Sequence, residues 1–174
     1  MYDIKNLIAL ESELKKNMRV HFVDFLSSHD YNKYSRSVVS KSMSTLLDAE
    51  KSYYGRGLYV ILSDYQLDQN KCSFTLDGLK AVYRGHGYKV KSRLKSHLFN
   101  DHYRRNLPEK GVRYDVCMKL DDKNGINIDE SPYNKYRWKV VVYKMMNSSK
   151  MMREQAELAF DEVYGRPLAS KEPG

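Results

Sequence analysis

Apolar residues recur at helical spacing near the start of the chain. Between about residues 3 and 23 they return every three or four positions, with Glu and Lys between them, which predicts an amphipathic helix. They are Ile4, Leu7, Ile8, Leu10, Leu14, Met18 and Phe22. A polar run at residues 27–30 ends this helix, because Ser and Asp side chains compete for backbone hydrogen bonds. A second apolar pattern, from about Ser35 to Tyr53, predicts a second helix.

The pattern then changes to short runs of β-branched and aromatic residues between turn formers. Such runs are typical of strands. The sequence contains three such runs, at residues 57–62, 81–85 and 136–145. The basic stretch at residues 89–99 predicts a short helix after the second strand. A last helix is predicted from Ser148 to Tyr164, with Ser148 or Ser149 as its N-cap and Gly165 as its end.

Residues 63–78 lie between the first two predicted strands and follow neither pattern clearly. They could form an extended hairpin, in which Cys72, Phe74 and Leu76 alternate on one face. An ordinary long loop is the favoured alternative, since polar residues and turn formers dominate the stretch. Both alternatives stay open at this point.

Residues 100–137 are the least regular part of the chain. Their turn formers include Asn124-Gly125, a strong signal for a tight turn. Residues 112–120 alternate in polarity, and residues 120–128 predict a hairpin with this Asn-Gly pair in its turn. We treat the whole stretch as an irregular insert.

Together these elements predict a small α+β domain that uses the whole chain, residues 1–174. A central antiparallel sheet of about three strands is flanked by helices. Residues 1–54 form an N-terminal extension of two extra helices, and residues 55–174 form the core, with the insert at 100–137. A chain of 174 residues can bury such a core without disulfides or metals.

The net charge of +8 is concentrated in one part of the chain. Residues 80–113 hold ten Lys and Arg against Asp101 and Glu109, whereas the segments before and after are balanced. Positive charge of this density is favoured beside a phosphate backbone, through release of counterions. The alternative is a solvated basic face without a partner.

The chain carries no signal for a disulfide framework, a zinc site or a membrane. Cys72 and Cys117 lack CxxC spacing, which favours two unpaired thiols. Acidic residues near the N-terminus argue against a signal peptide, and no apolar run is long enough to span a bilayer. We therefore expect a cytoplasmic protein.

Two tripeptides occupy the first two predicted strands, and two residues on the basic helix follow them. Gly57-Leu58-Tyr59 lies on the first strand and Tyr83-Arg84-Gly85 on the second. Arg93 follows ten residues after Tyr83, and His97 four after Arg93. These elements, in this order, resemble the GIY-YIG nuclease family, and the Arg and His spacing resembles one branch of it.

The end of the chain adds to this resemblance. Residues 157–166 (ELAFDEVYGR) are similar to the family's closing segment, in which a metal-binding glutamate precedes an apolar pair and Tyr-Gly-Arg. The resemblance implies Glu157 as the ligand of a single Mg²⁺ or Mn²⁺, with Glu154, on a similar face of the helix, as the alternative. The family usually ends with an asparagine, and here Ser170 stands in its place.

The resemblance implies a metal-dependent DNA endonuclease. Its catalytic residues would be Tyr59, Tyr83, Arg93, His97 and Glu157. Arg93 would pair with the scissile phosphate, Tyr59 would accept a proton from the attacking water or orient it, and His97 would assist or relay that proton. His86, three residues after Tyr83, stands where some members have lysine, and its role is open.

Double-stranded DNA is the partner that this resemblance implies. The basic residues expected to contact it are Arg84, Lys89, Lys91, Lys95, Arg104 and Arg105. Because one such site acts on one phosphate at a time, cutting both strands needs a homodimer, a higher homo-oligomer or sequential nicks. The restriction, homing and phage branches are all compatible, which implies a bacterial, phage-infected or mobile-element host cell.

Two other functions compete with the nuclease. One is a catalytically inactive nucleic-acid-binding module of the same fold, which Ser170 favours. The other is a protein-interaction adaptor, which predicts an exposed apolar face on an N-terminal helix. Because the chain holds 15 tyrosines, each motif tyrosine taken alone is also compatible with ordinary packing.

Overall fold

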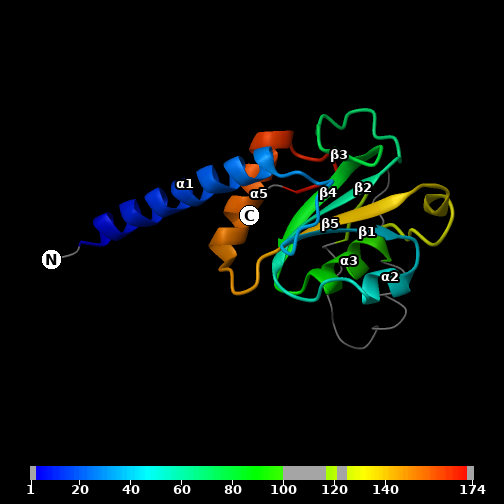
Figure 1. Ribbon diagram of the computed structural model, residues 1–174, viewed down its shortest axis with the longest axis horizontal. Coiled ribbons are helices and arrows are strands. Elements are labelled where there is room, and N and C mark those ends of the chain that lie inside the picture. Colours follow the sequence, from blue (N-terminus) through cyan, green and yellow to red (C-terminus); the bar gives the residue numbers. More distant parts are fainter. Residues whose placement is uncertain (1–2, 100–116, 121–124, 172–174) are drawn as a thin grey trace.

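An antiparallel sheet runs through the middle of the protein (Figure 1). The computed structural model describes residues 3–99, 117–120 and 125–171, and within them the sheet has five strands. These are β1 (Val38–Met43), β2 (Gly57–Ser63), β3 (Thr75–Leu76), β4 (Leu79–Gly87) and β5 (Trp138–Lys144). Their order across the sheet is β1-β5-β2-β4-β3. The α+β class is confirmed, and the three predicted strands are the central neighbours β5, β2 and β4. The expected number of about three is wrong, because β1 and β3 add an edge on each side.

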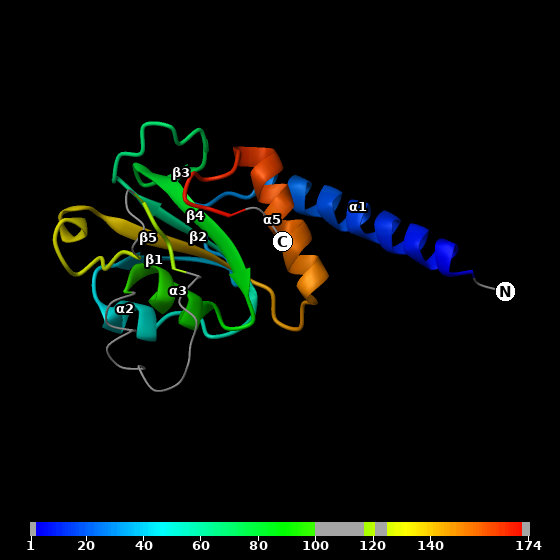
Figure 2. The same cartoon turned by 180° about the vertical axis from the view of Figure 1, so that it is seen from behind.

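Helices cover both faces of this sheet (Figures 1 and 2). In the described part of the chain they are α1 (Ile4–Ser28), α2 (Leu46–Glu50), α3 (Val90–Leu98) and α5 (Lys150–Tyr164). Helices α1 and α5 pack together over one face, while α2 and α3 lie on the other. A single 3₁₀ turn, Tyr133–Lys135, precedes β5.

Alternate side chains of β2 divide the core into two layers, because successive residues of a strand point to opposite faces. Tyr59 and Ile61 pack on the α3 side, in a cluster with Leu94. Val60 packs on the other side, in a cluster with Phe160 of α5. Every residue of β2 is buried. The motif tyrosine on this strand is therefore held by the core of the protein.

The helix predicted over residues 35–53 is wrong. In its place the chain forms edge strand β1 and then the short helix α2. Val38 pairs with Tyr143 of β5, and Met43 pairs with Trp138. The helical spacing of the apolar residues is outweighed because β-branched valines favour strands and because β1 pairs with the otherwise open edge of β5.

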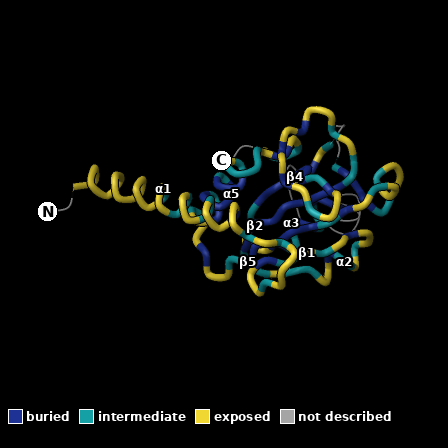
Figure 3. Tube along the Cα trace, turned by 45° about the horizontal axis from the view of Figure 1, so that its top comes forward, coloured by how far each residue is buried: buried dark blue, intermediate teal, exposed yellow. Residues whose placement is uncertain are grey.

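The first predicted helix is confirmed as α1, but its apolar face is only partly covered. From Met18 onward this face lies against the body of the protein, whereas the first half extends into solvent (Figure 3). The exposed apolar residues of that half are Ile4, Leu7, Ile8, Leu10 and Leu14. Ile4 is 73% exposed and Leu14 is 50% exposed. The apolar face of α1, which was expected to contact the core, is therefore exposed to solvent over about half of the helix.

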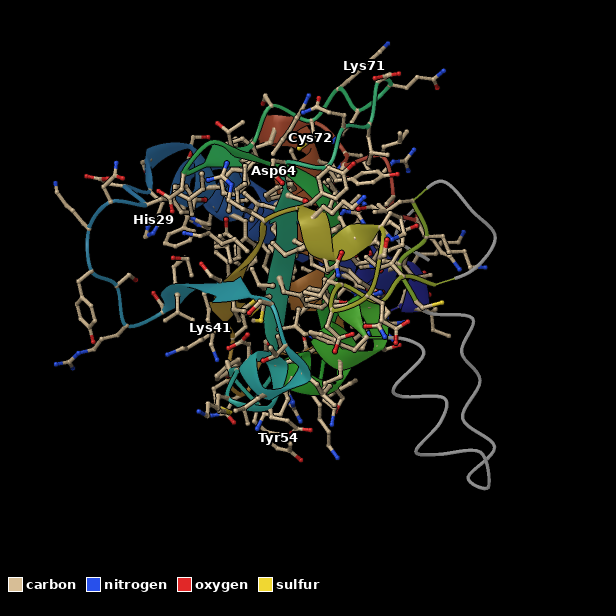
Figure 4. All side chains as sticks on the ribbon, turned by 90° about the vertical axis from the view of Figure 1, so that its right-hand side faces the viewer. His29, Lys41, Tyr54, Asp64, Lys71 and Cys72 are labelled. Atoms are coloured by element: carbon tan, nitrogen blue, oxygen red, sulfur yellow. The ribbon has the colours of Figure 1, made fainter. Side chains whose placement is uncertain are left out.

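Most of the stretch between β2 and β4 is a loop, as one of the two alternatives predicted. Only Thr75–Leu76 pairs with β4, through a turn in which Asp77 and Gly78 both have positive φ. Cys72 is buried and its thiol is free, while the neighbouring Lys71 points away from the body (Figure 4). The hairpin predicted around Asn124 lies mostly outside the described residues.

The predicted last strand and last helix are confirmed as β5 and α5. Ser149 is the N-cap of α5, and its Oγ accepts a hydrogen bond from the backbone N–H of Met152 at 3.1 Å. The helix ends at Gly165, whose φ of 78° suits glycine. These two ends fix the rotation of α5 and so decide which side chains reach the sheet.

Candidate active site

The two motif tyrosines lie on adjacent strands beside a glycine. In the β2–β4 pairing, Tyr59 stands opposite Gly85. A Cβ atom at Gly85 would lie 2.7 Å from Oη of Tyr59 and 3.1 Å from a ring carbon of Tyr83. The two rings are stacked with their centroids 6.2 Å apart. Glycine is needed here because any side chain would occupy the space of these rings.

His97 of α3 completes this group on the same face of the sheet. Its Nε2 atom lies 2.8 Å from Oη of Tyr59, within hydrogen-bond distance, and its ring centroid lies 4.3 Å from that of Tyr83. Both Tyr59 and His97 are fully buried. The predicted proximity of these three catalytic candidates is therefore found.

Burial controls the protonation of this pair. Desolvation and the neighbouring Tyr83 raise the pKa of Tyr59 well above its usual value, while the charge of Arg93 opposes the rise. Desolvation and the charge of Arg93 hold the pKa of His97 well below its usual value. His97 is therefore neutral at pH 7, and its Nε2 can accept a hydrogen bond from the Tyr59 hydroxyl.

Arg93 of α3 stands beside the tyrosines. It is half-buried, and its interaction with the Tyr59 hydroxyl helps to raise the pKa of the guanidinium. Its Nε–H is buried and has no hydrogen-bond partner among the described residues. An arginine with a spare donor beside a phenol is suited to binding an anion.

Glu157 reaches the site from α5, on the opposite face of the sheet. Its Oε1 accepts a hydrogen bond from Nη1 of Arg84 at 2.7 Å. Asp161, one helical turn later, accepts two more from the same guanidinium, at 2.9 and 2.6 Å. The charge of Glu157 also raises the pKa of Tyr83, although burial is the larger cause. The carboxylate therefore acts on the tyrosine group across β4.

The alternative carboxylate, Glu154, has a different setting. It forms a 3.2 Å ion pair with Lys150 one turn earlier, and its side chain is 22% exposed. Glu157 is 5% exposed, and its burial and the charge of Asp161 raise its pKa to about 7 against the opposing charge of Arg84. Of the two, Glu157 has the environment typical of a functional group.

His86 and Ser170 lie on either side of Arg84. Nε2 of His86 is 3.6 Å from Oε2 of Glu157, and burial, together with the charge of Arg153, lowers the pKa of His86 to about 4. Oγ of Ser170 accepts a hydrogen bond from the backbone N–H of Arg84 at 2.8 Å. Ser170, which stands at the position expected for asparagine, therefore satisfies a backbone donor at the open edge of β4.

The residues expected to contact DNA divide into three groups. Arg84 is 2% exposed and its donors are engaged by Glu157 and Asp161, which argues against a direct DNA contact. Lys89 is exposed, whereas Lys91 and Lys95 are half-buried and Lys95 forms an ion pair with Glu50. Residues 104–105, the two remaining arginines, lie outside the described residues.

Two residues of this site were not predicted from the sequence. Asp161 lies four residues after Glu157, so that helical spacing could have indicated it. Arg153 is fully buried one turn before Glu157, and no sequence signal distinguishes it from the other basic residues. Within the described residues, no cluster of three or more His, Cys, Asp or Glu side chains is arranged to hold a metal.

Comparisons with known proteins give no relative for this chain. No family model, no curated protein and no solved structure matches it. In the described part of the chain, no helix has the length and apolar character needed to cross a membrane.

Proposed function

We propose that the protein is a metal-dependent endonuclease of the GIY-YIG type that hydrolyses phosphodiester bonds of DNA. The observation that carries the proposal is the 2.8 Å contact between Oη of Tyr59 and Nε2 of His97, with Arg93 beside it. A buried phenol is a poor base, so its role is to orient the attacking water, which requires a hydrogen-bond partner that fixes the hydroxyl and a cation nearby for the phosphate. Both are present.

In this proposal the phenol and the imidazole act as one unit. The Tyr59 hydroxyl orients the attacking water, and its hydrogen bond to Nε2 of neutral His97 fixes this hydroxyl in place. The guanidinium of Arg93 pairs with the scissile phosphate and stabilises the charge that develops on it. Tyr83, stacked on Tyr59, holds the phenol in place.

Glu157 is the residue that would hold Mg²⁺ or Mn²⁺. Its Oε1 is engaged by Arg84, whereas its Oε2 faces His86, whose lowered pKa keeps the imidazole neutral at pH 7. One carboxylate oxygen, with phosphate and water, is enough for a hard cation of this kind. The metal would supply additional positive charge at the phosphate.

A catalytically inactive nucleic-acid-binding module of the same fold is the second candidate. The ion pair between Arg84 and Glu157 favours it, since the protein already neutralises the carboxylate. This module would bind nucleic acid in a salt-dependent way and would not cut it with any divalent metal.

Cleavage of supercoiled plasmid DNA separates these two functions. The parent protein is incubated with Mg²⁺, Mn²⁺ or EDTA beside Tyr59→Phe and Glu157→Gln, with the exposed Tyr34→Phe as the matched control. The nuclease predicts metal-dependent cutting by the parent and the control only. Retarded but uncut DNA would support the binding module, and equal cutting by all variants would overturn the proposed site.

A further inference from the structure

A basic hollow opens beside the candidate active site. It has a volume of about 390 Å³ and lies where the starts of α3 and α5 meet the end of β4. The side chains that matter here are His86, Tyr88, Lys89, Arg93, Lys150 and Arg153. All but Tyr88 carry basic groups. Lys150 is paired with Glu154, and the other nearby acid, Glu157, is paired with Arg84.

Arg153 is the unusual member of this set. It is fully buried, and its Nη1 donates to the backbone oxygen and the Oγ of Ser148 at 2.8 and 3.0 Å. Its Nε and Nη2 atoms have no hydrogen-bond partner among the described residues. The guanidinium lies 4.3 Å from the ring centroid of Tyr88. A buried cation that has no acidic partner in the described part of the chain is costly, so its fixed donors point to an anion as ligand.

We propose that this hollow binds a backbone phosphate of nucleic acid next to the phosphate that Arg93 would hold. Arg153 supplies two fixed donors, and the exposed Lys89 closes the hollow from α3. This inference rests on the proposed function, because it takes DNA as the substrate. It assigns Arg153 as a positioning residue that acts on the register of the strand and not on the reacting atoms.

The test measures binding of a short DNA duplex in EDTA, where no metal-dependent cleavage interferes. Arg153→Gln should lower the affinity about tenfold and reduce the slope of log affinity against log salt by about one. Arg153→Lys should recover part of the affinity, because a lysine still supplies the charge. The matched control is Arg19→Gln, which removes a half-buried arginine of α1 that donates to Oε1 of Gln155 on α5. Thermal unfolding shows that each variant is folded.

The outcomes separate this inference from the proposed function. A folded Arg153→Gln protein with unchanged affinity and salt slope would overturn the phosphate site while leaving the nuclease intact. A folded parent that binds no DNA would overturn the proposed function itself, and this inference with it. Loss of affinity in Arg19→Gln equal to that in Arg153→Gln would show a general charge effect and would also overturn the site.

A separate observation concerns the bare half of α1. Its exposed apolar residues continue the same helix face that Met18 and Phe22 use against the body. Met18 and Phe22 also line an apolar groove of about 470 Å³. The exposed apolar residues of the first half of α1 and the groove therefore follow one another along a single helix face, which we call the stripe. Such a surface is self-complementary if a twofold axis relates two copies and places their α1 helices antiparallel.

We infer that the occupant of this surface is a second copy of the chain, with the two α1 helices antiparallel. In the register centred on residue 13, Ile4 faces the partner's Phe22 and Ile8 faces the partner's Met18. The same register places Glu11 opposite the partner's Lys15, and Lys15 opposite the partner's Glu11. These two residues are the charged members of the stripe and pair within one chain at 2.7 Å. Apolar and charged positions are thus both matched.

Charge reversal tests this pairing. The parent should be dimeric by sedimentation velocity, and Glu11→Lys and Lys15→Glu, each alone, should be monomeric because like charges then face each other. Mixing the two variants should restore a dimer, since each supplies the charge that the other lacks. Lys16→Glu, next to the stripe, is the control, and circular dichroism checks that α1 stays helical. A monomeric parent, dimeric single variants or a mixture that stays monomeric would each overturn this interface.

Discussion

Arg84 of β4 and Glu157 of α5 form a buried ion pair in which Nη1 donates to Oε1 at 2.7 Å. The same guanidinium binds Asp161, and its Nη1 also donates to the backbone oxygen of Lys171. One side chain therefore joins the edge of the sheet, helix α5 and the C-terminal segment. The candidate metal ligand is oriented by an arginine in the middle of the Tyr-Arg-Gly motif.

Removal of this arginine should destabilise the protein strongly. Arg84→Met leaves the Glu157 and Asp161 carboxylates without their partner, and breaking a buried pair in this way typically costs about 3–5 kcal/mol. Arg137→Met, which removes an exposed pair with Asp64, is the matched control and should cost at most about 1 kcal/mol. Urea unfolding of both variants at pH 8 measures the difference. Equal losses in the free energy of unfolding would show that burial does not make the Arg84 pair more stabilising than the exposed Arg137 pair.

The raised pKa of Glu157 makes its contribution to stability depend on pH. In the folded state the carboxyl titrates near pH 7, against a usual value of 4.5. Between these values the folded state holds more protons than the unfolded state, so the parent gains stability as the pH falls. Glu157→Gln lacks this gain. Its stability relative to the parent should therefore fall by roughly 3 kcal/mol from pH 8 to pH 4.5.

Comparison of the two proteins at each pH isolates this carboxyl. Histidines such as His86, whose folded-state pKa is lowered to about 4, change stability in the opposite direction, since acid favours their charged unfolded form. The effects of histidines remote from Glu157 are common to the parent and to Glu157→Gln and cancel in the difference, whereas that of His86, 3.6 Å from Oε2 of Glu157, does not. Making the same comparison on a His86→Gln background removes this contribution. A difference that stays constant from pH 8 to pH 4.5 would contradict the raised pKa of Glu157.

The sequence predicted best where local signals and tertiary contacts agree. The Ser149 cap, the Gly165 end and the valine-rich run of β5 all specify the same elements that the structure contains. Residues 38–43 were misjudged because their apolar spacing suits a helix, while the pairing of β1 with β5 is set by residues about 100 positions away. Local periodicity does not contain that information.

The candidate site shows the same division. The order of Tyr59, Tyr83, Arg93 and His97 predicted correctly that they lie together, because two adjacent strands and the next helix bring them to one face. The partner of Arg84 was missed, since Glu157 is 73 residues away and a basic residue in a basic stretch suggests a surface contact. Charge counts describe a segment but not the direction of each side chain.

Replacing Gly85 should disturb the two motif tyrosines directly. A methyl group there would lie 2.7 Å from Oη of Tyr59, so Gly85→Ala must displace the ring and lengthen the contact with His97. Overpacking of this kind costs about 1–3 kcal/mol. Gly87→Ala is the comparison, because its methyl group would meet only the flexible Arg93 side chain at 3.0 Å. Urea unfolding checks this, and a Gly85→Ala protein as stable as the parent would contradict it.

Tyr59 and His97 should behave as one catalytic unit if the nuclease proposal holds. Tyr59→Phe removes the hydroxyl that orients the attacking water, and His97→Gln removes the imidazole that fixes this hydroxyl, so either change disturbs the same water. Each should lower the single-turnover cleavage rate by about 10²–10⁴-fold. The double variant should be no slower than the slower single variant, because His97 acts only through the Tyr59 hydroxyl. Multiplied effects would mean that the two residues act independently and that the 2.8 Å contact serves packing alone.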